Sequence, residues 1–439
     1  MLVDENFKQR LRRLFSVMIP ILITQTAIMA MNFFDSSMSG HAGAVDLAGT
    51  SIGGNIWMPI FVGTNGVLLG AMPIVAHLLG ADKRDNIGKV IRHTIFLAIA
   101  FSAVIILMGV LFLDTLLTHL HLEPQVHYIA KMYMAAVAVG VIPFFMSTSL
   151  IDTLGHTGIT MKIYLLALPV NAFLNYCFIF GKLGMPRLGG VGAGVATGIT
   201  YWLEFAIFVW IVHKLPAFEH FRIFKDRFHL DIKQLRENLS IGVPIGLAMF
   251  MEASIFGVVA LFIAKFGTVI IAAHQAALGF TSLLYMVPLS FSMALTILVG
   301  VEAGAKRFEE AQKFSRMGIA LNMAIAIFLA VLVYTNRPYI AMLYTTDPVI
   351  IEKVVGFLFY AIFFQLFDAT AAPIQGILRG YKDVKATFYS GFFAYWVVCL
   401  PLGCFLDFVM EHGPAAYWQS LDIGLFFSAV FLTLRMFWL

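Results

Sequence analysis

Long apolar runs follow one another along almost the whole chain, separated by short polar stretches. A helix needs about 20 apolar residues to cross the hydrocarbon of a bilayer, and twelve runs meet that requirement. They cover residues 14–37, 47–73, 91–113, 130–152, 161–181, 192–213, 238–264, 274–300, 315–335, 353–378, 386–408 and 415–437. The pattern therefore predicts an all-α polytopic membrane protein with twelve transmembrane helices.

Composition supports this prediction, because 60% of the 439 residues are hydrophobic and only 12% are charged. Soluble domains hold roughly 45–50% apolar and ~25% charged residues. The longest polar connection, 214–237, is too short for a further domain. The first apolar run is too long for a signal peptide, so we expect it to stay as the first helix. Three cysteines, Cys177, Cys399 and Cys404, fall inside predicted helices and are expected to be buried hydrophobes.

The basic residues are distributed unevenly between the two sets of loops. Of 29 Lys and Arg, 23 fall on the side of the two chain ends and six on the other. The positive-inside rule therefore places both termini in the cytoplasm, and we expect a bacterial cytoplasmic (inner) membrane. A nucleic-acid partner would need a basic face on a soluble domain, which this pattern does not provide.

The two halves of the chain repeat each other at an offset of 224 residues, so that Ser16 and Pro20 correspond to Ser240 and Pro244. Each half has an even number of spans, so both insert with one orientation and should be related by a pseudo-two-fold axis along the membrane normal. The predicted domains are an N-lobe (1–214), a cytoplasmic linker (215–237) and a C-lobe (238–439). Such repeats are typical of transporters, with the site between the halves.

Each half begins with a short amphipathic segment, 7–15 in the first and 231–239 in the second. We expect these segments to lie at the membrane surface, with their basic residues toward lipid phosphates.

Four acids fall within predicted spans, where a charge costs ~2.5–3.5 kcal/mol and is a functional candidate by default. They are Asp35, Glu204, Glu252 and Asp368. No Lys or Arg is expected deep enough to pair with them, so each should hold a proton or recruit a cation. A structural role remains open for all four, and it is favoured for Glu204. Three other acids, Asp152, Glu302 and Asp407, fall at helix ends and are expected to be solvated or to cap helices.

The fifth span places Asn171 and Asn175 one helical turn apart on one face. Amides in hydrocarbon need hydrogen-bond partners, and Asp35 is the candidate partner. Thr197 and Thr200 on the sixth span are candidates to join them, although Thr also serves as packing between membrane helices.

Several stretches, taken together in this order and spacing, resemble the multidrug and toxic compound extrusion (MATE) family, in particular its bacterial NorM branch. They are IPILITQTA and MNFFDSSMSGHAG in the first span, the LLGADKR loop, PVNAFLNYCFIFG in the fifth span, and the Glu252–Asp368 pair. The resemblance covers essentially the whole chain. It implies two six-helix bundles forming a V around a central cleft, and antiport of Na+ or H+ against cationic, lipophilic drugs and dyes.

The resemblance also implies roles for individual residues. Asp35 matches the N-lobe acid that takes up protons or contacts substrate, with Asn171 and Asn175 as its hydrogen-bonding partners. Glu252 and Asp368 match the C-lobe cation-binding pair, which would hold Na+ in a sodium-coupled member. Some sodium-coupled relatives have a Tyr one turn before the tenth-span Asp, and Phe364 stands there in this chain. The coupling ion, Na+ or H+, therefore stays open.

The expected partners are cationic amphipathic small molecules and the lipid bilayer, with no cofactor beyond the coupling ion and a monomeric chain. One alternative is a flippase for a lipid-linked cell-wall or polysaccharide precursor. Such proteins usually hold pyrophosphate with cationic residues, whereas acids line this sequence's spans. The other alternative is a membrane enzyme, but the 12 His show no metal-binding spacing. We therefore expect a secondary transporter that exports drugs, and no enzyme.

Overall fold

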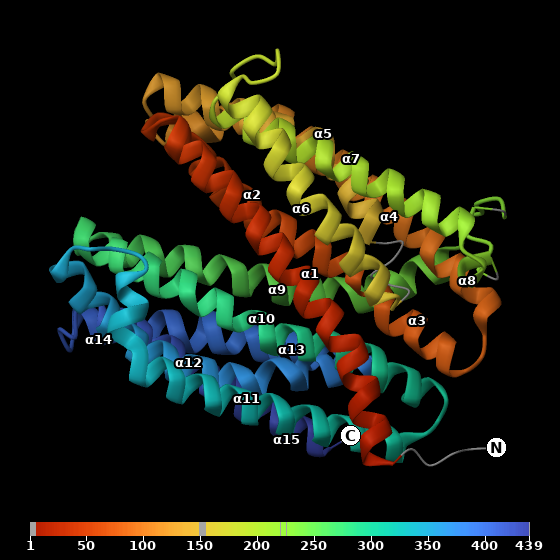
Figure 1. Cartoon of the computed structure of the whole chain (residues 1–439). Helices are drawn as coiled ribbons and strands as arrows, with labels where there is room; N and C mark the ends of the chain where they lie inside the picture. Colours follow the sequence, from red (N-terminus) through yellow and green to blue (C-terminus); the bar gives the residue numbers. More distant parts are fainter. Residues whose placement is uncertain (1–5, 149–154, 220, 225, 439) are drawn as a thin grey trace. The chain divides into compact units, whose positions relative to one another are not determined.

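The computed structural model describes residues 6–148, 155–219, 221–224 and 226–438, and their regular structure is entirely helical (Figure 1). The helices that precede the 214–237 connection or lie within it are α1 (Phe7–Ala42), α2 (Ala44–Leu69), α3 (Ala71–Gly80), η1 (Arg84–Asn86), α4 (Ile87–His119), α5 (Pro124–Ser147), α6 (Thr157–Phe180), α7 (Gly190–Lys214) and α8 (Pro216–Glu219). The later ones are α9 (Ile232–Ala264), α10 (Thr268–Gly304), α11 (Phe308–Met342), α12 (Pro348–Gly380), α13 (Val384–Gly391), η3 (Phe392–Cys399), α14 (Leu400–Phe408) and α15 (Ala415–Phe437).

Within the described ranges, twelve helical segments are long and apolar enough to cross a membrane, which confirms the predicted fold class. Several segments are longer than the apolar runs that predicted them. The first extends over Phe7–Ala42 and the second over Ala44–Gly80, where α2 and α3 meet at Gly70. The predicted helix-end residue Asp152 lies outside the described residues.

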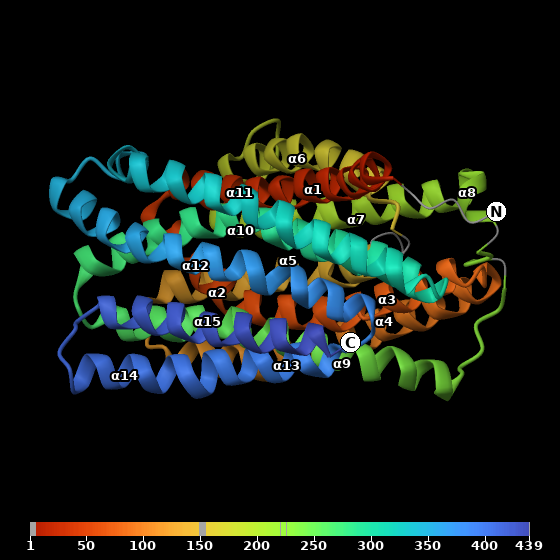
Figure 2. The same ribbon diagram turned by 90° about the horizontal axis from the view of Figure 1, so that it is seen from below.

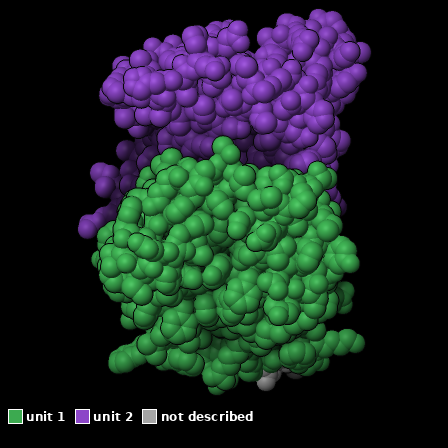
Figure 3. Space-filling view, turned by 90° about the vertical axis from the view of Figure 1, so that its left-hand side faces the viewer, with its two compact units in different colours: residues 1–22, 247–439 green, residues 23–246 purple. Residues whose placement is uncertain are grey.

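The chain forms two compact units, coloured separately in Figure 3. Unit 1 comprises residues 1–22 and 247–439, and unit 2 comprises residues 23–246. The two boundaries between the units, at residues 22/23 and 246/247, fall inside the helices α1 and α9. The predicted lobes follow the sequence repeat rather than compactness, and their limits stay a prediction.

In unit 2, α7 packs against α5 through glycines spaced four residues apart, and the two helices run side by side in Figure 1. A Cβ atom on Gly194 would lie 2.7 Å from the Tyr133 carbonyl oxygen, and one on Gly198 would lie 3.0 Å from the Ala136 carbonyl oxygen. Small residues at this spacing let membrane helices approach closely. The close approach fixes the position of α7, which carries Thr197.

The start of α9 is fixed to α4 within unit 2. Lys89 Nζ lies 2.5 Å from Asp231 Oδ2, and this hydrogen bond holds the pKa of Asp231 down to about 2. The Asp231 backbone N–H donates to His93 Nε2 (2.9 Å), and the Asn238 amide donates to the Thr94 hydroxyl (3.0 Å). These bonds explain why unit 2 continues past the connection to Gly246.

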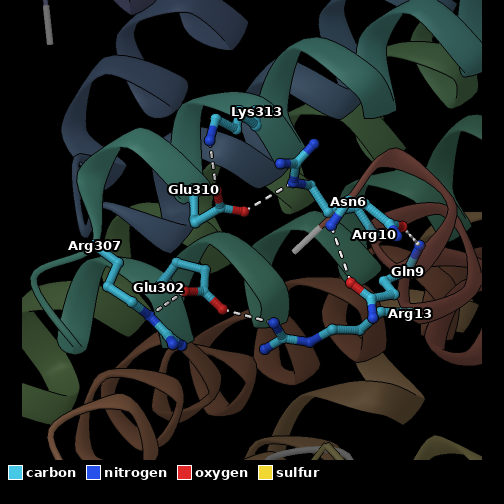
Figure 4. Close-up of polar contacts among 8 residues, drawn as sticks. All are labelled: Asn6, Gln9, Arg10, Arg13, Glu302, Arg307, Glu310 and Lys313. Carbon is cyan, nitrogen blue, oxygen red and sulfur yellow. Dashed lines mark hydrogen bonds and ion pairs between the residues drawn. The ribbon is translucent and has the colours of Figure 1, made fainter. Parts of the chain in front are cut away.

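Ion pairs fix the start of α1 to α10 and α11 within unit 1 (Figure 4). Arg10 Nε lies 2.8 Å from Glu310 Oε2, and Arg13 Nη1 lies 2.7 Å from Glu302 Oε1. Arg307 Nε lies 2.6 Å from the other Glu302 oxygen. Glu302 is only 1% exposed and pairs with both arginines, so the prediction of a solvated or capping role was wrong. Segment 7–15 is the continuous beginning of α1, and two of its arginines pair with acids in place of the predicted lipid phosphates.

Replacement of Glu302 by Gln is expected to destabilise the folded protein. The change leaves two guanidinium groups without the carboxylate between them, and breaking a buried pair from one side is costly. Both arginines are partly exposed, so solvent screening reduces the loss to about 1–2 kcal/mol. The measurement is the melting temperature of the detergent-solubilised chain. Glu309→Gln, an exposed acid in the same region, is the matched control and should leave that temperature unchanged.

The eleventh span of the chain, Val384–Phe408, belongs to unit 1 and contains a π-helical segment, η3, between α13 and α14. Pro401 provides the physical reason, because it has no N–H to donate to a carbonyl in the preceding turn. The Leu400 N–H accordingly bonds to the Tyr395 carbonyl five residues back. Figure 2 shows α15 lying along this span, and a Cβ on Gly424 would come within 2.5 Å of the Ala394 carbonyl oxygen. Such π segments are frequent at functional sites, and Tyr395 lies in this one.

Asp407, at the end of the same span, is 8% exposed. It pairs with Lys265 and accepts a hydrogen bond from the Tyr417 hydroxyl (2.6 Å). The acid is therefore buried and paired, and the prediction of a solvated or capping role was wrong.

Candidate functional sites in the two units

Asp35 lies in unit 2, on α1, and is 9% exposed. The Asn175 amide nitrogen donates to Asp35 Oδ1 (2.6 Å), and the Thr197 hydroxyl donates to Asp35 Oδ2 (2.8 Å). The same Asn175 nitrogen lies 3.2 Å from Asn171 Oδ1. Residues from three helices, α1, α6 and α7, therefore meet at one buried carboxyl group.

The threonines complete this network on α7. The Thr200 hydroxyl donates to the Ala196 carbonyl (2.8 Å), which leaves its oxygen to accept from the Asn171 amide nitrogen at 3.5 Å. The structure thus brings together all five residues predicted for the N-lobe site. We call Asp35, Asn171, Asn175, Thr197 and Thr200 the Asp35 network.

The chemistry of the Asp35 network is that of a carboxyl group surrounded by neutral donors. In the part of the chain that the structure describes, Asp35 forms no ion pair, and its two oxygens accept hydrogen bonds from Asn175 and Thr197. Asn175 Oδ1 is buried, and no donor reaches it among the described residues. The site can therefore stabilise a carboxylate, and the free amide oxygen offers a neighbouring acceptor when a proton is added.

Glu204 is fully buried on α7, one helical turn beyond Thr200. The hydrogen bonds described for Asp35 do not include it, although the Tyr201 ring interacts electrostatically with both acids. Glu204 therefore lies outside the Asp35 network, and its role stays open.

Unit 1 holds two of the four acids predicted within the spans, Glu252 and Asp368. Asp368 on α12 is 4% exposed, Glu252 on α9 is partly buried, and the two carboxyl groups interact electrostatically. Two tyrosines interact with both of them, Tyr285 of α10 and Tyr395 of η3. We call Glu252, Asp368, Tyr285 and Tyr395 the acid–tyrosine cluster.

Asp368 lacks a full set of partners. Its Oδ2 atom is buried, and no hydrogen bond reaches it from any described residue. Phe364, one turn earlier, has a hydrocarbon ring and gives the site no oxygen. It packs against Phe256 with ring centroids 5.9 Å apart. The two carboxyl groups offer only oxygen atoms, which suit a hard monovalent cation or a proton.

Arg379 is the basic residue of α12 nearest to the end of this span, and no ion pair between it and Glu252 is described. The expectation that no Lys or Arg lies deep enough to pair with these acids stays a prediction. The sequence placed Arg379 just past the apolar run 353–378, whereas a helical side chain tilts toward the N-terminus of its helix. Arg379 thereby reaches back into the span.

The sequence prediction also missed Asp422 on α15, which is 8% exposed. Its Oδ1 atom is buried, with no hydrogen-bond partner in the described part of the chain. The signal was present in the sequence, because Asp422 interrupts the last apolar run, 415–437. The aromatic members of the acid–tyrosine cluster carried no such signal, since the chain has 14 Tyr.

Comparison with known proteins decides the family. The MatE family model matches the chain twice, over residues 20–177 and 244–405, in agreement with the repeat of the two halves. The chain belongs to the MatE family. Members of this family are membrane transporters, so this chain is a transporter and no enzyme.

Curated relatives extend the MatE match over nearly the whole chain. A protein of Halalkalibacterium halodurans named "Probable multidrug resistance protein NorM" is 47% identical over 98% of this chain and 95% of its own length. A Bacillus subtilis protein of the same name is 44% identical over 98% of this chain and 96% of its own length. The resemblance to the NorM branch is therefore confirmed.

Solved structures of MATE transporters share the fold. The eukaryotic MATE transporter AtDTX14 aligns with a TM-score of 0.87 and 17% identity, over 99% of this chain and 96% of that chain. An outward-facing multidrug resistance MATE family transporter of the MOP superfamily aligns with a TM-score of 0.88 and 19% identity, over 98% and 95%. At these identities the likeness shows the fold alone.

Proposed function

We propose that this MatE protein exports cationic, lipophilic drugs and dyes in exchange for Na+ or H+, by alternating access. Its relatives at 43–47% identity carry the name of a multidrug resistance protein, which supports the substrate class. The two sets of buried carboxyl groups, one in each unit, support coupling to a cation.

The observation that carries the proposal is the acid–tyrosine cluster of unit 1. Glu252 and Asp368 are like charges in a low-dielectric site, and they cannot both stay ionised unless positive charge lies near them. The buried Asp368 Oδ2 has a free lone pair for that charge. A monovalent cation or a proton therefore fits this site, although Phe364 supplies no oxygen to it.

The Asp35 network is assigned to proton uptake or drug contact in unit 2. Its neutral donors, Asn175 and Thr197, hold the carboxylate without cancelling its charge. That charge remains for a proton or for a cationic drug. Aromatic and Met side chains, of which the chain has 42 Phe and 22 Met, suit varied aromatic cations through cation–π and sulfur–aromatic contacts.

The proposed setting is a bacterial cytoplasmic membrane with both termini in the cytoplasm, and a monomeric chain. The 23 to 6 division of Lys and Arg between alternate loops supports this orientation.

The flippase alternative is less well supported. Recognition of a pyrophosphate group needs several cationic donors. The acid–tyrosine cluster has two carboxyl groups against the single Arg379 guanidinium, and the Asp35 network has none among its partners. Both sites thus favour a cation over an anionic lipid head group.

The function is tested by drug uptake into inverted membrane vesicles that contain the chain, with ethidium as the probe. A Na+ gradient and a pH gradient are imposed separately, each directed from the vesicle lumen outward. We expect ethidium accumulation under at least one gradient, and its collapse when the matching ionophore is added. Vesicles without the chain are the control. Accumulation under neither gradient would refute cation-coupled drug export.

A further inference from the structure

An apolar groove runs between the eleventh and twelfth spans, where α15 packs against α13 and η3 within unit 1 (Figure 2). Its volume is about 420 Å³. One wall is formed by Tyr389, Phe393 and Val397, which follow one another at four-residue spacing. The other wall is formed by Phe427 and Phe431 of α15. These five side chains are 46–60% exposed, so they meet the hydrocarbon of the bilayer rather than the core of the unit.

The floor of the groove is made of small side chains, which is why the hollow exists. Ser390 of α13 and Ser428 of α15 are 3% and 2% exposed, and their hydroxyl oxygens lie 2.7 Å apart. The two hydroxyl groups hydrogen-bond to each other, which leaves the groove apolar. A hollow of this kind stays dry, and it gains dispersion contacts when a flexible apolar chain fills it.

The length of the groove matches one leaflet of the bilayer. Tyr389 and Val397 are eight residues apart, which is about 12 Å at the rise of a helix. The hydrocarbon core of a bilayer is about 30 Å thick, so one leaflet contributes ~15 Å. The eleventh span begins at Val384, little more than one turn before Tyr389. The groove therefore starts near the membrane surface and covers most of the depth of one leaflet.

Both walls continue into a basic residue at the same end of the groove. Lys385 is exposed and lies one helical turn before Tyr389, on the same face of α13. Arg435 lies one turn after Phe431 on α15. Arg435 Nε is 2.7 Å from Asp383 Oδ2, which fixes the end of α15 beside the start of α13. That bond uses one of the five N–H donors of the guanidinium group, and no ion pair is described for Lys385.

We propose that this groove binds one anionic phospholipid of the cytoplasmic leaflet, with an acyl chain along the groove and the phosphate at Lys385 and Arg435. The leaflet follows from the proposed orientation, in which the start of the eleventh span and the end of the twelfth face the cytoplasm. Basic pockets between membrane helices on that side suit anionic head groups. The site lies apart from the drug and cation sites, so it goes beyond the proposed function.

A second copy of this chain fits the groove less well. Copies in one membrane share an orientation, and a symmetric pair would bring the same surface of each copy together. Lys385 and Arg435 of both copies would then lie at one level, where like charges repel. A phospholipid instead supplies the opposite charge at that level and an apolar chain below it.

The test is native mass spectrometry of the full-length, detergent-solubilised chain. It is titrated with phosphatidylglycerol and, in parallel, with phosphatidylcholine of the same acyl chains. We expect one phosphatidylglycerol to bind in preference to phosphatidylcholine. Glycerol phosphate, which carries the anionic group without acyl chains, should not displace it. Lys385→Gln should weaken phosphatidylglycerol binding about fivefold, the equivalent of about 1 kcal/mol for one basic residue at a membrane surface. Lys385→Gln/Arg435→Gln should abolish the preference.

Further variants separate the apolar walls from the charge. Val397→Trp places a larger ring in the groove, so it should weaken the binding of both lipids alike. Lys83→Gln/Arg84→Gln is the matched control, because it also removes an exposed lysine and an arginine whose Nε pairs with a nearby acid, here Asp82 at 3.3 Å. That loop belongs to unit 2, and the control should bind phosphatidylglycerol like the wild type. Lys385 is exposed, so Lys385→Gln is expected to fold normally.

Several outcomes would overturn the inference. Equal affinity of the wild type for the two lipids would make the groove an ordinary lipid-facing surface. Phosphatidylglycerol binding that Lys385→Gln leaves unchanged, or that the control variant weakens as strongly, would remove the role of the basic end. Displacement by glycerol phosphate would indicate a site for free phosphate, and a dimer mass lost in Val397→Trp would assign the groove to a second copy. None of these results affects the proposed drug export.

Discussion

Asp35→Asn is expected to reduce drug export about tenfold or more while the protein still inserts and folds. The Asn side chain matches Asp in shape, and its oxygen can still accept from Asn175 or Thr197. The Thr197 hydroxyl can rotate to accept from the new amide, because a hydroxyl group both donates and accepts. What the variant loses is the charge, and with it the capacity to bind a proton or attract a cationic drug.

The measurement is ethidium export and drug resistance in cells that express equal amounts of the variant and the wild type. Asp114→Asn is the matched control, since Asp114 is an exposed acid of unit 2 that pairs with Lys131. It should leave export unchanged. Unchanged export in Asp35→Asn would instead return Asp35 to a structural role, in which a hydrogen-bonding side chain of that shape is sufficient.

Asn175 links Asp35 to Asn171, which explains why Asp35→Asn is a better test than a change of Asn175. Its amide nitrogen serves both neighbours, at 2.6 and 3.2 Å. The network is thus a chain of donors directed at Asp35 rather than a set of independent contacts. Removal of the charge alone is therefore the cleanest change, because it leaves those donors in place.

The Asp35 network could be predicted from the sequence because each of its members carries a cost in hydrocarbon. Amides and carboxyl groups in a membrane span need partners, and Asn171 and Asn175 share a face by helical periodicity. The structure brings the carboxyl group and the two amides together.

The ion pairs of unit 1 could not be predicted in the same way. Glu302 and Arg13 are separated by 289 residues and both lie at helix ends, where solvation is the usual outcome. Arg379 is a different case, because its Cα lies at the end of an apolar run and the direction of its side chain decides which environment it enters. Sequence patterns locate helices by their Cα positions and do not give that direction.

Replacement of Glu252 by Gln, or of Asp368 by Asn, is expected to abolish ion-dependent transport and leave drug binding largely intact. Either amide removes one negative charge from the acid–tyrosine cluster. The remaining carboxyl group no longer has a like charge beside it and can stay neutral by holding a single proton, so the site no longer requires a cation. The expected result is drug transport that no longer responds to a Na+ or pH gradient.

Drug binding should survive because ion and drug act on the same equilibrium from different sites. A ligand shifts a conformational equilibrium only by its differential affinity for the two states. The cation in unit 1 can therefore compete with a drug without touching it, and loss of the cation site removes the coupling alone. By linkage, the drug should in turn alter cation affinity in the wild type, and this effect should vanish in both variants.

Isothermal titration of the purified wild type and both variants with ethidium, with and without Na+ and at two pH values, measures this coupling directly. Glu352→Gln changes an exposed acid on α12, the helix that also carries Asp368, and should match the wild type. Wild-type ethidium affinity is expected to fall as the coupling ion is added, whereas both variants should show one affinity throughout. If both variants lost ethidium affinity and kept their response to the ion, Glu252 and Asp368 would form the drug site. The division of roles between unit 1 and unit 2 would then be reversed, with the Asp35 network as the place where the cation acts.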